Sequence, residues 1–264
     1  MSKIKLKTGL EMFYLQEGSG KDLVLISGLS ANHQRWMPIL DDLKQQYRVT
    51  LFDNRGTGET ESSAGPYSVA MLSNDVIALM DALSIKAASV AGHSMGGFIV
   101  LQLCLAHPDR INKAVICAST AKLEYPQMMH INTMSKYMAM QIDPKLFFET
   151  VFPWLFAEPF LRDQKRVAQA MDEMLNNPHP QSIEAFKAQS AACESFDLRD
   201  KISQIQKETL IIAGREDLLT RLHCSEFMHQ KIPDSKLEIL ENCGHMFQLE
   251  HPKKLAKLIL DFLS

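Results

Sequence analysis

The sequence lacks the features that mark membrane and nucleic-acid-binding proteins. It has no apolar run long enough to span a bilayer, and its start, MSKIKLKTGLEMFYL, alternates charged with apolar residues instead of forming the unbroken apolar core of a signal peptide. It has no basic surplus either, because the formal net charge is -3 at pH 7. We therefore expect no nucleic-acid partner and no stable membrane association.

The sequence also lacks a paired-cysteine pattern. Its five cysteines are odd in number and widely spaced, and none forms a Cys-x-x-Cys pair; they are Cys104, Cys117, Cys193, Cys224 and Cys243. Disulfide and zinc frameworks need regular, closely spaced cysteines. The pattern favours a reduced, cytoplasmic protein.

What the sequence does have is an alternation of buried-strand and helix patterns. Short apolar runs read as strands: DLVLISG, YRVTLFD, AASVAG, KAVICAS, TLIIAG and KLEIL. Helical patterns separate them, and an antiparallel hairpin is expected around Thr8-Gly9. The sequence therefore predicts an α/β fold, with a mostly parallel central sheet and helices on both faces.

The alternation breaks between about Ala121 and Ile205. This stretch has helical patterns without a clear buried strand, and it carries seven of the 15 methionines. With 264 residues, 46% of them hydrophobic, the chain is long enough for one sizeable core. We predict a single domain in which a helical cap, residues 121–205, is inserted into a core of residues 1–120 and 206–264.

The apolar side chains of this predicted cap have two interpretations. They would line an apolar acyl pocket of modest size over the carboxyl ends of the strands, where α/β sheets bind their ligands. Alternatively, they only bury the cap against the core. The cap carries 9 Lys and Arg against 11 Asp and Glu, so its charge balance does not favour anionic substrates.

The stretch VAGHSMGGF, residues 90–98, sets Ser94 between a strand pattern and a helix pattern. Alone, a Gly-x-Ser-x-Gly stretch is a weak signal, because a serine also fits a tight turn. A sharp strand-to-helix turn, however, exposes the hydroxyl and places it near unpaired N–H groups at the helix start. We take Ser94 as the candidate nucleophile.

A serine nucleophile needs a base and a carboxylate that orients the base. His245 follows the strand KLEIL, whereas His93 adjoins the nucleophile and is expected to point away along the turn. Asp217 follows the strand TLIIAG, with Glu216 as a near competitor. The order Ser…Asp…His is that of one known triad arrangement.

Two backbone N–H groups are the expected oxyanion donors. One belongs to Met95, which follows the nucleophile. The other belongs to Leu29, in the loop after LVLIS. That loop also fits an ordinary turn at the end of a strand.

Taken together, GHSMGG, FDNRGTGET, AGREDLLT and NCGHMFQLEHP resemble the α/β-hydrolase family, in its lid-bearing serine esterase and lactonase branch, such as 3-oxoadipate enol-lactonases and carboxylesterases. The resemblance implies that Ser94 is the nucleophile, Asp217 the acid, His245 the base, and Leu29 and Met95 the oxyanion donors. It assigns a structural loop, and no chemistry, to Asp53, Arg55, Gly56 and Gly58.

The chain departs from many relatives in having Ser27-Gly28 instead of His-Gly, and Arg221 instead of proline after Thr220. A serine at position 94, where haloalkane dehalogenases and epoxide hydrolases need a carboxylate, argues against those two branches.

From the residues and the resemblance we expect a serine hydrolase that cleaves carboxylic esters or lactones through an acyl-enzyme. The expectation includes no metal, no organic cofactor, a small apolar ester or lactone as substrate, and a monomer or homodimer. A Ser-dependent carbon–carbon bond hydrolase and a cofactor-free perhydrolase are alternatives on the same scaffold. A ligand receptor without turnover and an inactive hydrolase relic are the alternatives outside active enzymes.

Overall fold

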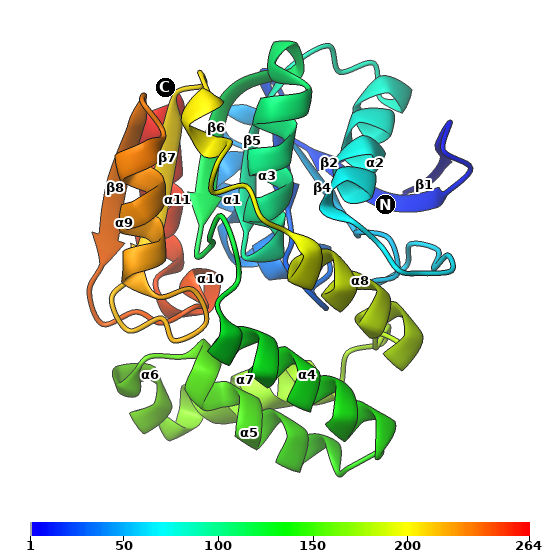
Figure 1. Cartoon of the computed structure of the whole chain (residues 1–264), viewed down its shortest axis with the longest axis vertical. Coiled ribbons are helices and arrows are strands. Elements are labelled where there is room, and N and C mark those ends of the chain that lie inside the picture. The colour runs from blue at the N-terminus through cyan, green and yellow to red at the C-terminus, as the bar shows by residue number, and fades with distance from the viewer. Residues whose placement is uncertain (1) are drawn as a thin grey trace.

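The computed structural model describes residues 2–264, and its centre is an eight-stranded sheet (Figure 1). The strands are β1 (Ser2–Lys5), β2 (Glu11–Glu17), β3 (Lys21–Ile26), β4 (Tyr47–Phe52), β5 (Ala88–His93), β6 (Ile111–Cys117), β7 (Thr209–Gly214) and β8 (Ser235–Leu240). Their order in the sheet is β1-β2-β4-β3-β5-β6-β7-β8. β1 and β2 pair antiparallel, and β3 to β8 are parallel. The predicted mostly parallel α/β sheet is confirmed.

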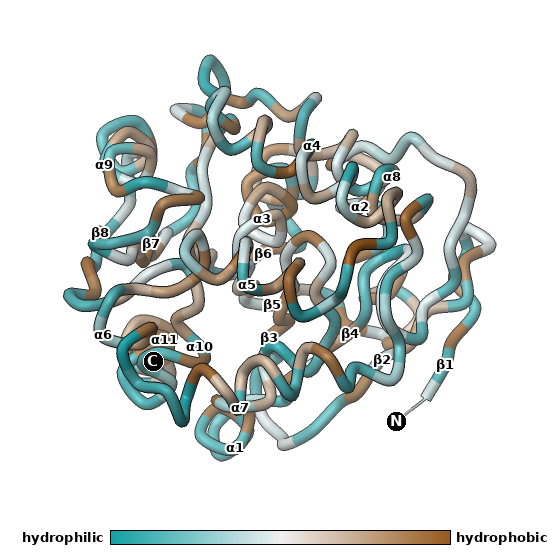
Figure 2. The backbone as a smooth tube through the Cα atoms, turned by 90° about the horizontal axis from the view of Figure 1, so that it is seen from below, coloured by the Kyte–Doolittle hydropathy of each residue, from teal (hydrophilic) through white to brown (hydrophobic). Residues whose placement is uncertain are grey.

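Helices cover both faces of the sheet. Apart from the five α-helices described below, they are η1 (His33–Trp36), α1 (Met37–Leu43), α2 (Val69–Ala82), α3 (Met95–Ala106), η2 (Pro108–Arg110), η3 (Ile202–Gln204), α9 (Leu222–Lys231), α10 (Phe247–Glu250) and α11 (Pro252–Leu263). Side chains of α2, α3 and α9 pack into one apolar cluster, and those of α1 and α11 pack into a second cluster. In Figure 2, β5, β6 and α3 lie near the centre of the view and are coloured mostly toward hydrophobic.

Local sequence explains where these elements begin and end. The predicted hairpin forms, with Lys5 opposite Glu11 in the β1–β2 register. The Ser68 hydroxyl caps α2 by accepting a hydrogen bond from the Met71 N–H at 3.1 Å. The helical segment after β3 begins as the 3₁₀ turn η1, which Asn32 caps, and continues as α1, with Pro38 in its first turn.

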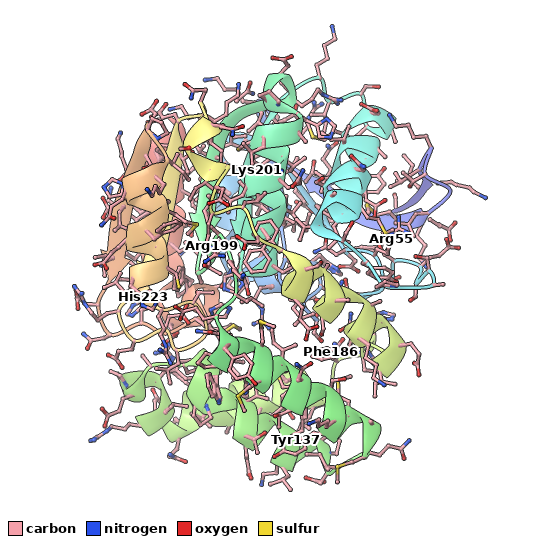
Figure 3. All side chains as sticks on the ribbon, viewed as in Figure 1. Arg55, Tyr137, Phe186, Arg199, Lys201 and His223 are labelled. Carbon is pink, nitrogen blue, oxygen red and sulfur yellow. The ribbon has the colours of Figure 1, made fainter. Side chains whose placement is uncertain are left out.

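Five α-helices, followed by η3, occupy the chain between β6 and β7. They are α4 (Tyr125–Ala139), α5 (Pro144–Leu155), α6 (Glu158–Arg162), α7 (Gln164–Leu175) and α8 (Ile183–Ser195), and we call them the cap. Figure 1 shows α4 to α7 below the carboxyl ends of the strands, with α8 running beside the core. Figure 3 shows Tyr137 on α4 and Phe186 on α8. The cap has an apolar cluster of its own around Phe152, Phe156 and Phe160.

All five cysteines are free and buried. Across residues 2–264, no helix reaches the length and apolar content that a membrane crossing requires.

Candidate active site

Ser94 stands at a sharp turn between β5 and α3. Its φ is 57°, a left-handed conformation that costs a non-glycine residue free energy. The turn brings backbones so close that a Cβ on Gly92 would lie 2.2 Å from the Gly96 carbonyl oxygen, and one on Gly96 would lie 2.2 Å from the Ile26 carbonyl oxygen. The glycines of the motif are therefore required by the turn that presents Ser94.

Asp217 and His245 meet at the carboxyl ends of β7 and β8. Asp217 Oδ2 lies 2.8 Å from His245 Nδ1, and both side chains are buried. Asp217 Oδ1 accepts hydrogen bonds from the N–H groups of Leu219 and Thr220, each at 2.8 Å. Because these donors fix the carboxylate, it can hold a proton on Nδ1 and leave Nε2 of the imidazole free to accept one.

Glu216 faces a different part of the molecule. Its Oε2 accepts a hydrogen bond from the Glu158 N–H at 3.0 Å, at the start of α6 in the cap. Of the two candidate carboxylates, only Asp217 makes a hydrogen bond to His245 in the described chain.

Ser94 and His245 line one cavity, between the core and the cap. Within residues 2–264 no hydrogen bond joins the Ser94 hydroxyl to the His245 ring. Hydrogen bonds between a nucleophile and its base are often longer in the absence of substrate. The structure therefore brings together the pair Asp217–His245 and sets Ser94 in the same cavity.

The two candidate oxyanion donors lie on opposite sides of Ser94 in the sequence and line the same cavity. In the described chain, neither the Leu29 N–H nor the Met95 N–H donates a hydrogen bond to a protein acceptor. The loop before Leu29 is held by Ser27, whose hydroxyl donates to the Asn32 carbonyl at 2.9 Å. Two unpaired N–H groups in the cavity that holds the nucleophile are what an oxyanion site requires.

His93 has a role that the sequence did not reveal. Its Nε2 lies 2.7 Å from the His245 carbonyl oxygen, and the two rings are 4.8 Å apart. Burial holds the pKa of His93 well below its ordinary value, so the ring is neutral and Nε2–H donates this bond. His93 therefore supports the backbone of the candidate base.

Glu250 is a second support that no isolated sequence signal marks. Its buried carboxylate accepts hydrogen bonds from the N–H groups of Gly244 at 2.9 Å, Met246 at 3.2 Å and Ala157 at 2.9 Å. Burial nevertheless raises the pKa of Glu250. These bonds fix the loop on both sides of His245 and connect it to the cap.

The cavity has a volume of about 770 Å³, within the usual range of ligand pockets. Apolar cap side chains line much of it, including Ile131, Met134 and Met138. Polar groups lie among them, and burial lowers the pKa of His130 to about 4. Buried polar atoms of Gln127, His130 and Gln181 have no hydrogen-bond partner in the described chain. Some polar atoms therefore lie within a mostly apolar lining.

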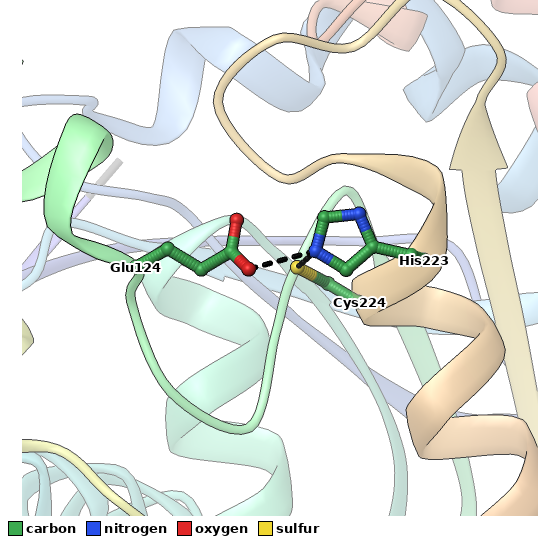
Figure 4. Close-up of side chains that lie close together, drawn as sticks. All are labelled: Glu124, His223 and Cys224. Carbon is green, nitrogen blue, oxygen red and sulfur yellow. Dashed lines mark hydrogen bonds and ion pairs between the residues drawn. The ribbon is translucent and has the colours of Figure 1, made fainter.

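Three potential metal ligands lie together at the edge of the cap. Side-chain atoms of Glu124, His223 and Cys224 are all within 4.8 Å of one another (Figure 4). Glu124 Oε1 and His223 Nε2 are 2.7 Å apart, a contact that lowers the pKa of Glu124 and connects the start of α4 to α9. None of the three lines the cavity. The group could hold a metal ion, but outside the candidate site.

The family model of the alpha/beta hydrolase fold matches residues 22–252. The chain belongs to this family. A relative named carbamate hydrolase RutD, from Caulobacter sp. strain K31, is 28% identical over 248 residues, which cover 92% of this chain and 90% of the relative. The 3-oxoadipate enol-lactonase 2 of Acinetobacter baylyi is 27% identical and covers 88% of this chain and 84% of the relative.

Among solved structures, the enol-lactonase from Burkholderia xenovorans LB400 is similar to this α/β-hydrolase, with a TM-score of 0.85 at 26% identity. The alignment covers 99% of each chain. The resemblance inferred from the motifs is therefore confirmed. The chain is a hydrolase-family protein with lactone-degrading enzymes among its structural neighbours.

Proposed function

We propose that this α/β-hydrolase is a serine hydrolase that cleaves carboxylic esters or lactones through an acyl-enzyme. The observation that carries the proposal is the 2.8 Å contact between Asp217 and His245, a residue that lines the same cavity as the strained Ser94 turn. Lactone-cleaving enzymes among the relatives and structural neighbours support this bond type.

In the first half-reaction, Ser94 Oγ attacks the substrate carbonyl carbon while His245 Nε2 takes the hydroxyl proton. The carbonyl oxygen becomes an oxyanion between the N–H groups of Leu29 and Met95. Asp217 stabilises the positive charge that forms on His245. His245 then gives its proton to the leaving oxygen, the carbon–oxygen bond breaks, and the acyl group remains on Ser94.

In the second half-reaction, water attacks the acyl-enzyme and gives a proton to His245. The same two N–H groups hold the second oxyanion. Collapse returns the proton to Ser94 and releases the acid. In a lactone the leaving hydroxyl is part of the acyl group. It therefore stays on the acyl-enzyme until this step, which releases a hydroxy acid.

We further propose that the chain is one domain, with a core of residues 1–120 and 206–264 and an inserted cap of residues 121–205. In this arrangement the core supplies every group named in the reaction. The cap covers the substrate and sets which acyl groups fit.

Turnover of a panel containing an aryl ester, a lactone, a thioester and a carbamate tests the proposal. The wild type should hydrolyse the ester or the lactone, and Ser94→Ala should lose about 10^4- to 10^6-fold in kcat. Ser195→Ala, at the end of α8 and outside the cavity, is the matched control. Hydrolysis that survives Ser94→Ala would contradict the mechanism, and tight binding without turnover by the wild type would favour a receptor.

A further inference from the structure

Among residues 2–264, one Lys or Arg side chain lines the cavity, and it has no hydrogen-bond or ion-pair partner there. Arg35 lies in η1 and faces the same cavity as Ser94 and His245. No hydrogen bond or ion pair joins its guanidinium to another of residues 2–264. Other arginines of the chain do pair with carboxylates: Arg48, Arg55, Arg110, Arg162, Arg199 and Arg215. Arg35 therefore keeps its full donor capacity for a ligand.

The surroundings of Arg35 make an unpaired charge costly. Burial lowers its pKa to about 10, which still leaves the guanidinium charged at neutral pH. The residue keeps some accessible surface although protein surrounds it, which is expected if that surface faces the cavity. A desolvated cation without a partner costs free energy, and a carboxylate that binds its two N–H edges in parallel removes that cost.

Glu173 is the acidic residue among the cavity-lining side chains. It is exposed on α7, and its Oε1 accepts a hydrogen bond from Gln169 Nε2 at 2.9 Å. Its charge acts on Arg35 from a distance, without an ion pair between them. The guanidinium therefore remains open to an anion that enters from the cavity.

The backbone around Arg35 is held in place. The His33 N–H and Nδ1 lie 2.7 and 2.8 Å from the buried Asp53 Oδ1, so that η1 is fixed to the loop after β4. Arg35 and the candidate oxyanion donor Leu29 also belong to one connection, between β3 and α1. A carboxylate bound to Arg35 would therefore be positioned relative to the oxyanion donors.

We propose that Arg35 binds a free carboxylate of the substrate, so that the preferred esters or lactones carry a carboxylate away from the scissile bond. This inference depends on the proposed hydrolase function and names its substrate class. The sequence-based charge count missed this cation because it covered only residues 121–205, whereas Arg35 projects from the core.

The test compares two esters of one aryl alcohol, a monoester of glutarate and the neutral pentanoate of similar length. We expect the wild type to have the higher kcat/KM on the anionic ester. Arg35→Met should lower the ratio of anionic to neutral kcat/KM about ten- to hundredfold, as for loss of a charged hydrogen bond. For Arg35→Lys this ratio should lie between those of the wild type and Arg35→Met, because lysine keeps the charge but not the planar pair of donors. Glu173→Gln should raise the ratio, because it removes a competing anion.

A second readout does not need turnover. Calorimetry on Ser94→Ala should detect glutarate binding whose affinity falls as salt is added. Adding Arg35→Met to this variant should lower the affinity about ten- to hundredfold. If both esters and a lactone are inert but this binding is seen, the hydrolase proposal fails and the carboxylate site stands. If Ser94 hydrolyses both esters and Arg35→Met changes neither the ratio nor the binding, the inference about Arg35 is wrong. Equal changes of the ratio in Arg35→Met and Glu173→Gln would instead assign Arg35 to a contact with the cap and overturn it.

Discussion

The core wall and the cap wall of the cavity are built differently. On the core side, carboxylates such as Asp217 and Glu250 each accept several hydrogen bonds, and short turns hold the reacting groups. On the cap side, helices line the cavity with unbranched methionines and leave large apolar side chains in solvent, with Tyr125 72% and Met140 71% exposed.

This difference separates chemistry from substrate choice. Groups that must meet a transition state within tenths of an ångström lie on strand ends, where backbone hydrogen bonds fix them. Groups that only contact the substrate lie on helices whose side chains adapt to shape. We therefore expect large effects from core substitutions at the triad and graded effects from cap substitutions.

The largest expected effect is that of Asp217→Asn. The amide would present a donor to His245 Nδ1 and favour the wrong tautomer, so kcat should fall by about 10^4, or about 5 kcal/mol of transition-state stabilisation. Ester hydrolysis at saturating substrate measures it, with circular dichroism to show that the fold remains.

Glu216→Gln is the matched control for that substitution. Its amide oxygen can still accept the hydrogen bond from the Glu158 N–H, so kcat should change by less than about threefold. If Glu216→Gln lost activity and Asp217→Asn kept it, the acid would have to be reassigned.

An intermediate effect is expected on the pH dependence of stability. Burial lowers the pKa of His93, in the core, and lowers that of His130, in the cap, to about 4. Below pH 6.5 the unfolded chain protonates these rings while the native state does not. The free energy of unfolding therefore decreases as the pH is lowered. His93 contributes up to about 1.4 kcal/mol per pH unit to this change in the free energy of unfolding, and the partly solvated His130 contributes less.

Urea unfolding between pH 7 and pH 4.5 measures these slopes. His93→Gln and His130→Gln should each flatten the curve in this range, His130→Gln by less. A His93→Gln curve parallel to that of the wild type would mean that the native His93 takes up its proton as readily as the unfolded chain.

The smallest effects concern the acyl chain. On neutral aryl esters, kcat/KM should rise from acetyl to hexanoyl by up to about fourfold per methylene, or about 0.8 kcal/mol, and fall once the cavity is filled. Met134→Ala and Met138→Ala should reduce this rise, because both side chains line the cavity. Met140→Ala is the control, since that side chain is 71% exposed and lies outside the cavity. A flat series in the wild type would exclude an acyl pocket.

The fold and the order of the candidate triad were predictable because each signal is local. A buried strand that ends in a glycine turn places the next polar residue at one edge of the sheet, as with Ser94 and Asp217. The glycines of the turn leave a visible pattern, since any Cβ at Gly92 or Gly96 would meet a backbone oxygen.

The rest depends on contacts between segments far apart in the chain. His93 supports the backbone of His245 from 152 positions away, and nothing in either segment shows it. In the sequence nothing distinguishes Arg35 from an exposed cation on a helix, because only the tertiary structure places it in the cavity. The volume and polarity of the cavity are likewise set by how the cap helices rest on the core, which periodicity does not determine.

The proposed mechanism requires that the core presents Ser94 as a nucleophile. Labelling with a fluorophosphonate followed by peptide mass spectrometry tests it most directly, because the probe reacts with an activated serine whatever the natural substrate is. We predict one adduct, on the peptide that contains Ser94, with none in Ser94→Ala and much slower labelling in Asp217→Asn. Labelling at another serine, or equal labelling of Ser94→Ala, would contradict the claim.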